Sequence, residues 1–381
     1  MQHTQHMQHM QHPRVPLLVL NLLVIAIPLV DASPPVPAVG AIRWDAWYGN
    51  EDAVGAYVEA ALTPNQWRYR LPFFAVEGGT EKVAIHGNTS AVMEAELAYA
   101  EKYGIEYWAF VAYPPPSHMF YAQKLYLEVT NRTQGTSVKF CLIMDGNQLS
   151  VLTKQLDRIV GYFHLPTYQT VLGGRPLVFT FISDSWAAAP LAAMSAAALS
   201  AGLPKPYIVA MGWGTPQRQM ALAKLLGAEA SSQYAFIGGN VNGTGPDVPN
   251  KPLSYASNAA QELQHWTDSA SAGFTVLPSI TAGWDPRPRE VVAPPWQGGG
   301  APPGCNVSGV ALCHVEDPTM PELTAHTRRM VAWTQDNPAS VPANAVIISA
   351  WNEHDEGHWI CPSLHDGAQK LEAIKAGLQE L

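Results

Sequence analysis

Two carboxylates near the carboxyl terminus are the residues of this chain best suited to chemistry. An apolar, β-branched run at 345–350 leads directly into Trp351-Asn352-Glu353-His354-Asp355-Glu356-Gly357-His358-Trp359. Such a run predicts a buried parallel strand, and the carboxyl ends of strands carry the catalytic side chains of a β/α barrel. Glu353 would close the strand and Glu356 would lie one tight turn further on. We therefore expect Glu353 and Glu356 to share one mouth of the fold as a catalytic pair.

Cleavage of a glycosidic bond is the reaction that suits this pair best. It needs a proton donor for the leaving oxygen and a second carboxylate at the sugar. Trp351 and Trp359 would offer flat apolar faces to a sugar ring. A strand end followed by a solvated acidic loop is the alternative interpretation of the same residues.

Side chains that follow other strand-like runs are expected to hold the substrate at the same mouth. Each aspartate among them could instead be structural or cap a helix. The expected substrate-binding residues are Asp45, Trp47, Tyr48, Tyr113, Asp145, Trp213, Trp284, Asp285, Trp351, Asn352 and His354.

Other catalytic chemistries fit the sequence less well. No Gly-x-Ser-x-Gly elbow of a serine hydrolase is present. His354, Asp355 and His358 crowd one loop, but zinc needs three convergent ligands and no His-Glu-x-x-His helix occurs. We expect neither a metal nor a cofactor, and expect His354 or His358 to hydrogen-bond a sugar or to tune a nearby glutamate.

The elements that must position these residues alternate between strand and helix. Eight such units in one chain predict a parallel, closed (β/α)8 barrel with long loops after the strands. An open doubly wound sheet is the alternative, although no Gly-rich phosphate motif follows the first strand. The expected strands are 42–47, 107–113, 139–144, 175–182, 207–211, 230–237, 275–281 and 345–350, and the expected helices are 90–103, 119–129, 149–163, 187–201, 216–226, 254–272, 321–335 and 367–378.

Two loops are unusually long. The residues before the helix at 90–103 are expected to form a first loop with a short hairpin, or else to contribute a barrel strand at 69–75. The Pro- and Gly-rich residues 285–318 contain Cys305 and Cys313, which we expect to form a disulfide. This loop would be an ordered lid or subsite wall, or a plain surface excursion.

The amino-terminal residues predict a targeting segment. Residues 1–11 are a Gln/His/Met repeat, and an apolar run at 15–30 is followed by Ala32 at a suitable cleavage site. The expected organisation is a signal peptide at 1–32, a Pro-rich spacer at 33–40 and a single catalytic barrel at 41–381, with secretion of the mature chain. An uncleaved membrane anchor is the alternative.

Sequons and cysteines agree with a secretory pathway. Four acceptor sequons predict glycosylation at Asn88, Asn131, Asn242 and Asn306. Cys141 lies in a strand-like run and is expected to be a buried thiol, whereas Cys361 has no assigned partner.

Composition limits the partners. The chain has 381 residues, of which 47% are hydrophobic, and a net charge of −9. A nucleic-acid partner would require a basic face, and an anionic membrane surface would require a polybasic run. We expect a monomer that binds a glycan or polysaccharide, no nucleic acid, and no membrane unless the amino-terminal apolar segment is retained.

The segment Trp351-Asn352-Glu353-His354-Asp355-Glu356-Gly357 resembles the Trp-Asn-Glu-x-x-Glu-Gly motif of the endo-α-mannosidase family of glycoside hydrolases, family 99, and of the related WbsX-like proteins. Gly283-Trp284-Asp285-Pro286-Arg287-Pro288-Arg289 is similar to a Gly-Trp-Asp-x-x-Pro-Arg type segment of the WbsX-like group. Asp45-Ala46-Trp47-Tyr48 resembles the aromatic end of the first strand.

The resemblance implies a (β/α)8 barrel that hydrolyses a mannoside within a glycan with retention of configuration. A glutamate matching Glu353 would assist attack by the substrate's own 2-hydroxyl, and one matching Glu356 would act as general acid and then general base. Partial burial beside Trp351 or Trp359 would raise the pKa of such an acid. His354 and Asp355 depart from the family pattern, and Asp355 would raise neighbouring pKa values.

Two alternatives to a hydrolase remain at this stage. A barrel that has lost its acid geometry would bind glycans without cleaving them. A WbsX-like protein related to glycosyltransferases would require an activated sugar donor.

Overall fold

The computed structural model describes residues 35–47, 53–79, 82–133, 136–146, 149, 153–182, 185–238, 252–295, 306–307, 310–311 and 314–379. Of the sequence predictions, the signal peptide, Tyr48, Asn242, Cys305 and Cys313 lie outside these residues, as does the side chain of Asn306. Residues Pro35–Leu381 form one compact unit.

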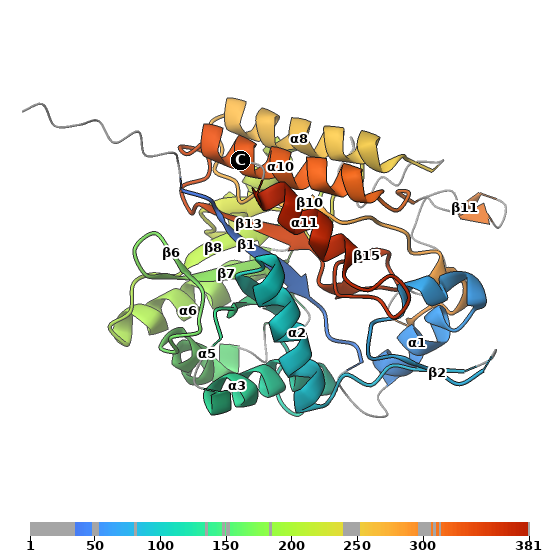
Figure 1. Cartoon of the computed structure of the whole chain (residues 1–381). Coiled ribbons are helices and arrows are strands. Elements are labelled where there is room, and N and C mark those ends of the chain that lie inside the picture. Colours follow the sequence, from blue (N-terminus) through green and yellow to red (C-terminus); the bar gives the residue numbers. More distant parts are fainter. Residues whose placement is uncertain are drawn as a thin grey trace, which may run out of the picture. The chain divides into compact units, whose positions relative to one another are not determined.

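Eight parallel strands form a ring around the apolar core of this unit (Figure 1). The sheet runs β10-β13-β1-β4-β5-β7-β8-β9, and the parallel bridge between Ser231 and Val276 joins its two ends. The predicted (β/α)8 barrel is therefore confirmed and the open doubly wound sheet is wrong. The strands are β1 (Ala38–Arg43), β4 (Tyr107–Val111), β5 (Lys139–Asp145), β7 (Arg175–Phe181), β8 (Tyr207–Met211), β9 (Ala230–Ser232), β10 (Ser279–Thr281) and β13 (Ala345–Ser349).

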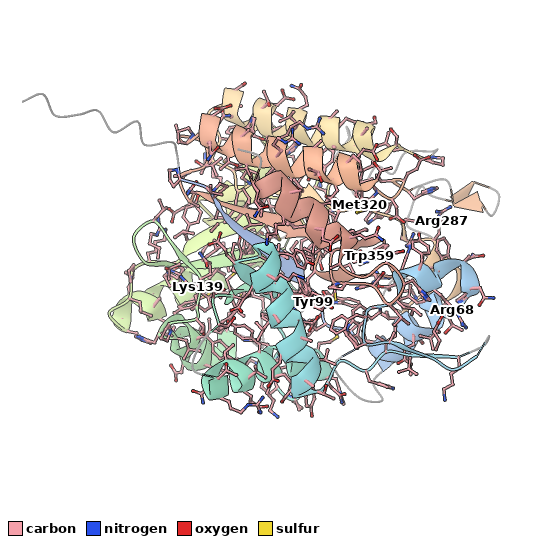
Figure 2. All side chains as sticks on the ribbon, in the orientation of Figure 1. Arg68, Tyr99, Lys139, Arg287, Met320 and Trp359 are labelled. Atoms are coloured by element: carbon pink, nitrogen blue, oxygen red, sulfur yellow. The ribbon has the colours of Figure 1, made fainter. Side chains whose placement is uncertain are left out.

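Helices cover the outside of the ring. In Figure 1, α8 and α10 run side by side along one flank, and α2, α3, α5 and α6 lie along the opposite flank. Side chains fill the space between ring and helices (Figure 2). The helices are α1 (Ala53–Leu62), α2 (Ser90–Tyr103), α3 (Tyr121–Thr133), α5 (Leu156–Phe163), α6 (Ala188–Ser200), α7 (Pro216–Leu226), α8 (Tyr255–Ser271), α9 (Pro288–Val291), α10 (Met320–Asp336) and α11 (Gln369–Gln379).

Short elements complete the described fold. Four 3₁₀ helices span Asn65–Arg70, His118–Phe120, Thr153–Gln155 and Ser185–Ala187. The remaining strands are β2 (Val76–Glu77), β3 (Val83–Ala84), β6 (Thr170–Val171), β11 (Asn306–Val307), β12 (Val310–Ala311), β14 (Asn352–Glu353) and β15 (His358–Trp359).

Local sequence signals explain where several helices begin and end. Helix α2 has the predicted bounds: the Thr89 side chain accepts the Val92 N–H, and Gly104 adopts the left-handed conformation at φ 82°. In α10, Thr319 and Glu322 form a reciprocal capping box. The caps at Thr89 and Thr319 satisfy N–H groups at the start of a helix, and the Gly104 N–H satisfies carbonyl groups at the end of α2.

Three expectations about the elements were wrong. The first strand is Ala38–Arg43 and not 42–47, because its pairing with β13 already starts at Ala38. Helix α1 occupies part of the expected first loop. The alternative strand at 69–75 does not form, because Asn65–Arg70 is a 3₁₀ helix that buries Trp67 and Arg70.

The features expected of a secreted protein are only partly within the described residues. Cys141 and Cys361 are both buried free thiols, as predicted for Cys141. Asn131 is exposed on α3 and Asn88 is half-buried in a loop, and glycosylation of either stays a prediction. Among the described residues, no helix has the length and apolar character needed to cross a membrane.

Gly40 of β1 makes room for an aromatic ring inside the barrel. A Cβ at this position would lie 2.2 Å from the ring of Tyr107, whose hydroxyl donates to the Val346 carbonyl at 2.8 Å. We expect Gly40→Ala to lower the free energy of unfolding by about 1–3 kcal/mol, as overpacking does.

Gly161→Ala is the control, because Gly161 is exposed in α5 and its added Cβ meets no atom within 4 Å. That change should stabilise the helix by about 0.5–1 kcal/mol. Urea unfolding of both variants measures the difference, and equal stability contradicts the prediction.

Candidate active site

A cavity of about 490 Å³ opens at the carboxyl ends of the barrel strands. Its wall is largely apolar and aromatic, with a few polar groups, which is the usual character of a small-molecule site. Its floor and walls come from the ends of β4, β5 and β7, from segments that follow β1, β8 and β9, and from the residues after β13. The lining side chains are Trp44, Val54, Val111, Tyr113, Met119, Ile143, Asp145, Phe181, Trp213, Tyr234, Arg289, Glu353 and Glu356.

A small hairpin carries the two glutamates. Asn352–Glu353 pairs antiparallel with His358–Trp359, so Glu353 lies opposite His358. The expectation that Glu353 closes the preceding strand was wrong, because β13 ends at Ser349 and the hairpin is a separate element. Gly357 in its turn has φ 79°, and a Cβ there would lie 2.5 Å from the Asp285 nitrogen.

That close approach joins the hairpin to the loop after β10. The Asp285 N–H donates to the Glu356 carbonyl at 2.7 Å. Gly283 has φ 126°, and a Cβ there would lie 2.6 Å from the Gly357 carbonyl oxygen. Only glycine fits both positions, and the contact brings α9, which follows this loop, against the two glutamates.

The two glutamates lie side by side and have different partners. Ligand atoms of Glu353, Glu356 and His358 all lie within 4.8 Å of one another. The Tyr234 hydroxyl donates to Glu353 Oε1 at 2.6 Å, and His358 Nε2 lies 2.9 Å from Glu356 Oε2. The side chain of Glu353 is 4% exposed and that of Glu356 is 21% exposed. Glu356 is thus the more accessible acid from the cavity.

Arg289 is the positive charge of the site. It comes from α9, and its side chain is 5% exposed. Its Nε lies 2.6 Å from Asp355 Oδ2 and its Nη2 lies 3.6 Å from Glu353 Oε2, and Nη1 pairs with Glu356 Oε1. A single guanidinium therefore contacts two buried carboxyl groups, those of Glu353 and Asp355, and the partly exposed one of Glu356, and its five fixed donors suit that task.

The surroundings push the pKa values of the two glutamates apart. Burial raises the pKa of Glu353 well above its ordinary value, and the negative charge of Glu356 adds to this rise. Burial acts in the same direction on Glu356, but Arg289 and His358 outweigh it and lower the pKa of Glu356 to about 2. The directions of these two shifts favour the protonated form of Glu353 and the ionised form of Glu356.

The raised pKa that we expected at Glu356 is thus found at Glu353. The reason is Arg289, which the sequence did not place beside Glu356. The expected effect of Asp355 is present, since its charge contributes to the raised pKa of Glu353 after burial and Glu356.

By spacing alone, Glu353, Glu356 and His358 could present three ligand atoms to a metal ion. Arg289 already pairs with both glutamates, and a guanidinium keeps its proton in proteins. The fixed positive charge of Arg289 would repel a metal ion bound at this point.

Several tryptophans and a histidine expected to contact the sugar lie away from the cavity. Trp351 is fully buried, and its indole N–H donates to Glu96 at 2.7 Å. Trp359, labelled in Figure 2, is 4% exposed and stacks on His354 at 5.4 Å between ring centroids. His354 also contacts Trp47 at 5.2 Å, and neither side chain is accessible. Trp47, His354 and Trp359 thus pack on one another beneath the hairpin, Trp351 packs on Trp108, and none of these four rings lines the catalytic cavity.

Asp45 and Asn352 belong to a buried network that aligns the hairpin with β1. Asn352 Nδ2 donates to Asp45 at 2.8 Å, and Asn352 Oδ1 accepts the Trp44 N–H at 2.9 Å. Arg43 bridges Asp45 at 2.8 Å and Glu96 at 3.1 Å. Both partners of each bond are inside the protein, so this network positions Glu353 and does not itself line the cavity.

Trp284 and Asp285 also have structural partners. Asp285 pairs with Arg287 at 2.6 Å and with Arg70, and these arginines lower its pKa despite its burial. Trp284 is 6% exposed and bridges to Val315 through the backbone. The two residues therefore anchor the loop that leads to Arg289.

Of the predicted substrate-binding residues, the structure brings Tyr113, Asp145 and Trp213 to the cavity with both glutamates. It adds residues that were not proposed from sequence, namely Trp44, Phe181, Tyr234 and Arg289. Trp44, Phe181 and Tyr234 each lie at or just after the end of a barrel strand, so the strand-end rule could have found them. Arg289 does not end a strand, and its only signal was its place in the Gly283–Arg289 segment of the resemblance, which gave it no role at the acid pair.

Comparisons with known proteins agree with the architecture. No protein-family model matches this sequence, and no curated protein matches it. A solved endo-alpha-mannosidase of glycoside hydrolase family GH99 from Bacteroides thetaiotaomicron, in complex with BIS-TRIS-propane, is similar over 89% of this chain and 95% of its own, with 16% identity and a TM-score of 0.54. Another structure of a GH99 endo-alpha-mannosidase from that organism is similar over 90% of this chain and 96% of its own, with 14% identity and a TM-score of 0.50. The likeness at this identity establishes a shared (β/α)8 fold.

Proposed function

We propose that this protein is a secreted glycoside hydrolase that cleaves a mannose-type glycan with retention of configuration. The observation that carries the proposal is the acid pair: Glu353 and Glu356 line one open cavity and lie side by side, and their surroundings shift their pKa values in opposite directions. Glycosidic cleavage requires one carboxyl that gives a proton and one that is ionised.

The distance between the acids supports retention. Their ligand atoms are within 4.8 Å, whereas the two carboxyl groups of inverting enzymes are about 6.5–9.5 Å apart to admit a water. The choice of mannose rests on the resemblance of the hairpin motif and on the likeness to the two endo-alpha-mannosidase structures.

The cavity wall suits a neutral sugar. Trp44, Phe181 and Trp213 offer apolar ring faces, and the Tyr113 hydroxyl, which accepts the Trp44 indole N–H at 3.2 Å, offers a polar edge. Arg289 is already engaged by carboxylates, so little positive charge remains for an anionic sugar.

The two acids have separate roles in the proposed reaction. Glu353 holds the proton in the ligand-free protein and donates it to the leaving oxygen. Glu356 is ionised and is the more accessible acid, so it takes the proton of the substrate's 2-hydroxyl as that oxygen attacks the anomeric carbon and the bond to the leaving oxygen breaks. Water then opens the resulting anhydro-sugar, which gives overall retention. The family resemblance implies the opposite assignment. Kinetics of the two acid variants on substrates with good and poor leaving groups distinguish the two assignments.

Hydrolysis of α-mannan and defined α-manno-oligosaccharides by the purified protein tests the function. We expect new reducing ends, and proton NMR of the first product should show the anomeric configuration of the substrate. Binding of these glycans without product would favour a glycan-binding barrel, and turnover only with an activated sugar donor would favour a transferase.

The pH dependence of kcat/KM follows from the shared proton. Lowering the pH adds a second proton only near the lowered pKa of Glu356, about 2. Raising the pH removes the single proton as it passes the raised pKa of Glu353. We expect activity to persist in acid and to fall on the alkaline side, above the ordinary range of a glutamate.

Tyr234→Phe provides the matched test of this profile. The Tyr234 hydrogen bond favours the ionised form of Glu353, so its loss should move the alkaline limb of kcat/KM to higher pH. An alkaline limb that stays in place, or moves to lower pH, contradicts the assignment of that limb to Glu353.

A further inference from the structure

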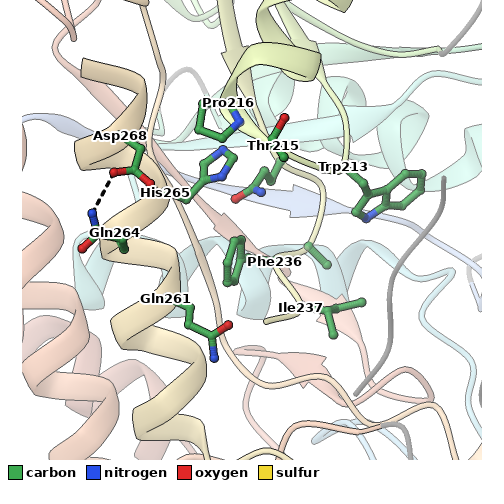
Figure 3. A pocket seen from close by; sticks show the side chains of 12 residues that line it. Trp213, Thr215, Pro216, Phe236, Ile237, Gln261, Gln264, His265 and Asp268 are labelled. Atoms are coloured by element: carbon green, nitrogen blue, oxygen red, sulfur yellow. Dashed lines mark hydrogen bonds between the residues drawn. The ribbon is translucent and has the colours of Figure 1, made fainter. Parts of the chain in front are cut away.

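A second, smaller cavity lies next to the catalytic one. Its volume is about 250 Å³, and Trp213 lines both cavities. In Figure 3, side chains of α8 stand on one side of this pocket, Trp213 stands on the other, and Phe236 lies between them. Pockets for drug-sized ligands measure about 300–1,000 Å³, so this one suits a single small ring. We call it the α8 pocket.

The polar lining of the α8 pocket consists mainly of amides. Gln233, Gln261 and Gln264 all line it. Each amide has both a carbonyl acceptor and an NH₂ donor, which matches a sugar hydroxyl that also donates and accepts. Trp213 and Phe236 add aromatic faces for the apolar side of a ring.

The charges of the α8 pocket argue against an anionic ligand. Among the described residues that line it, none is a lysine or arginine, and Asp268 adds negative charge. Burial lowers the pKa of His265 to about 4, so this imidazole is neutral near pH 7. A phosphate, a nucleotide or a uronic acid would find no counter-charge here.

Two buried polar atoms in the lining side chains lack a partner. Gln233 is 4% exposed and its Oε1 accepts no hydrogen bond, and the indole Nε1 of Trp213 donates none. One is an acceptor and the other a donor. Leaving such groups unpaired is costly, and a ligand rich in hydroxyls could satisfy both.

We propose that the α8 pocket binds one neutral sugar unit of a glycan that continues from the catalytic cavity past Trp213. The inference rests on the proposed function and specifies its substrate as a chain that extends beyond the cleaved linkage. Gln233 and Gln264 are its recognition residues, and neither lines the catalytic cavity.

Gln233→Leu is the variant that tests the proposal most directly. The Gln233 carbonyl makes no hydrogen bond in the folded protein, so leucine should fold with similar or greater stability. Gln264→Leu is a second variant, at an exposed helical position that suits leucine. Gln379→Leu, at the exposed end of α11, is the control and lines neither cavity.

Calorimetric titration of the full-length protein with methyl α-mannoside and methyl α-glucoside gives the first readout. We expect each pocket variant to weaken the binding of these glycosides at the α8 pocket by about tenfold. A loss of this size corresponds to one good hydrogen bond. Glucuronate serves as the anionic probe. Binding that is equal in all variants, or stronger for glucuronate than for the neutral glycosides, overturns the proposal.

Kinetics separate this inference from the proposed function. Gln233→Leu should raise KM about tenfold for α-mannotetraose and leave kcat/KM for an aryl mannoside unchanged. An unchanged KM for the tetrasaccharide in an active enzyme refutes the α8 pocket alone. Gln233-dependent sugar binding by a protein that hydrolyses no glycan leaves the α8 pocket standing and removes the hydrolase.

Discussion

Glu356→Gln is expected to lower kcat for glycan hydrolysis by about 10³-fold, within the range that a positioned acid or base contributes. Glu356 is the more accessible acid of the cavity, and its carboxylate is held by His358 and Arg289. Glutamine keeps the size of the side chain and removes the carboxylate that assists attack at the anomeric carbon. Steady-state kinetics on manno-oligosaccharides measure the loss. Glycan binding should be nearly unchanged, and the variant should fold with a lower unfolding midpoint because the ion pair with Arg289 is lost. A folded variant that retains turnover ends the assignment.

Glu353→Gln separates the roles of the two acids. An amide is close in shape to the protonated carboxyl that burial favours at this position, so the fold should tolerate it. If Glu353 donates the proton, its loss should matter much less for an aryl glycoside with a good leaving group. The Glu356→Gln loss should be the same for both kinds of substrate. The reverse pattern would transfer the acid role to Glu356, as the family resemblance implies.

Arg289→Met is expected to destabilise the protein by about 3–5 kcal/mol, the cost of removing one partner from buried ion pairs. Glu353, Asp355 and Glu356 would then face one another without a counter-charge. The pKa of Glu356 should rise, because Arg289 is the main charge that lowers it. Urea unfolding at neutral pH measures the loss of stability. The loss should shrink as the pH falls toward the lowered pKa of Glu356, about 2, because the ionised Glu356 that Arg289 stabilises is then lost in the parent protein as well.

Arg287→Met is the matched control for Arg289. Arg287 lies two residues earlier in the same loop, but its side chain is 37% exposed and its partner Asp285 keeps Arg70. Because Arg70 still neutralises the buried Asp285, the loss of stability should be well below that of Arg289→Met. Equal destabilisation by the two variants would show that Arg289 has no special role in balancing the acid pair.

The barrel was predictable because each of its units carries a local signal. The apolar run of β13 and the capped, glycine-terminated α2 have the periodicity and end residues that identify a strand and a helix. Helix α1 escaped prediction because it lies inside what was interpreted as one long loop, where no regular alternation pointed to it.

The aromatic residues of the motif show where local pattern fails. Trp351 and Trp359 flank the two acids in sequence, and nothing local distinguishes a ring that contacts substrate from one that supports a hairpin. In the fold, Trp351 turns to Glu96 and Trp359 stacks on His354. The distinction depends on neighbours that are far away along the chain.

The sequence alone determined that a parallel barrel would form and that Glu353 and Glu356 would meet at one of its mouths, because strand periodicity and spacing are local properties. Only the tertiary structure decided which of the two acids has the raised pKa. That outcome depends on Arg289, which lies 67 residues from Glu356 and reaches it only because Gly283 and Gly357 let two loops touch. Electrostatic energy depends on distance in space and on burial, and neither can be read from the order of residues along a chain.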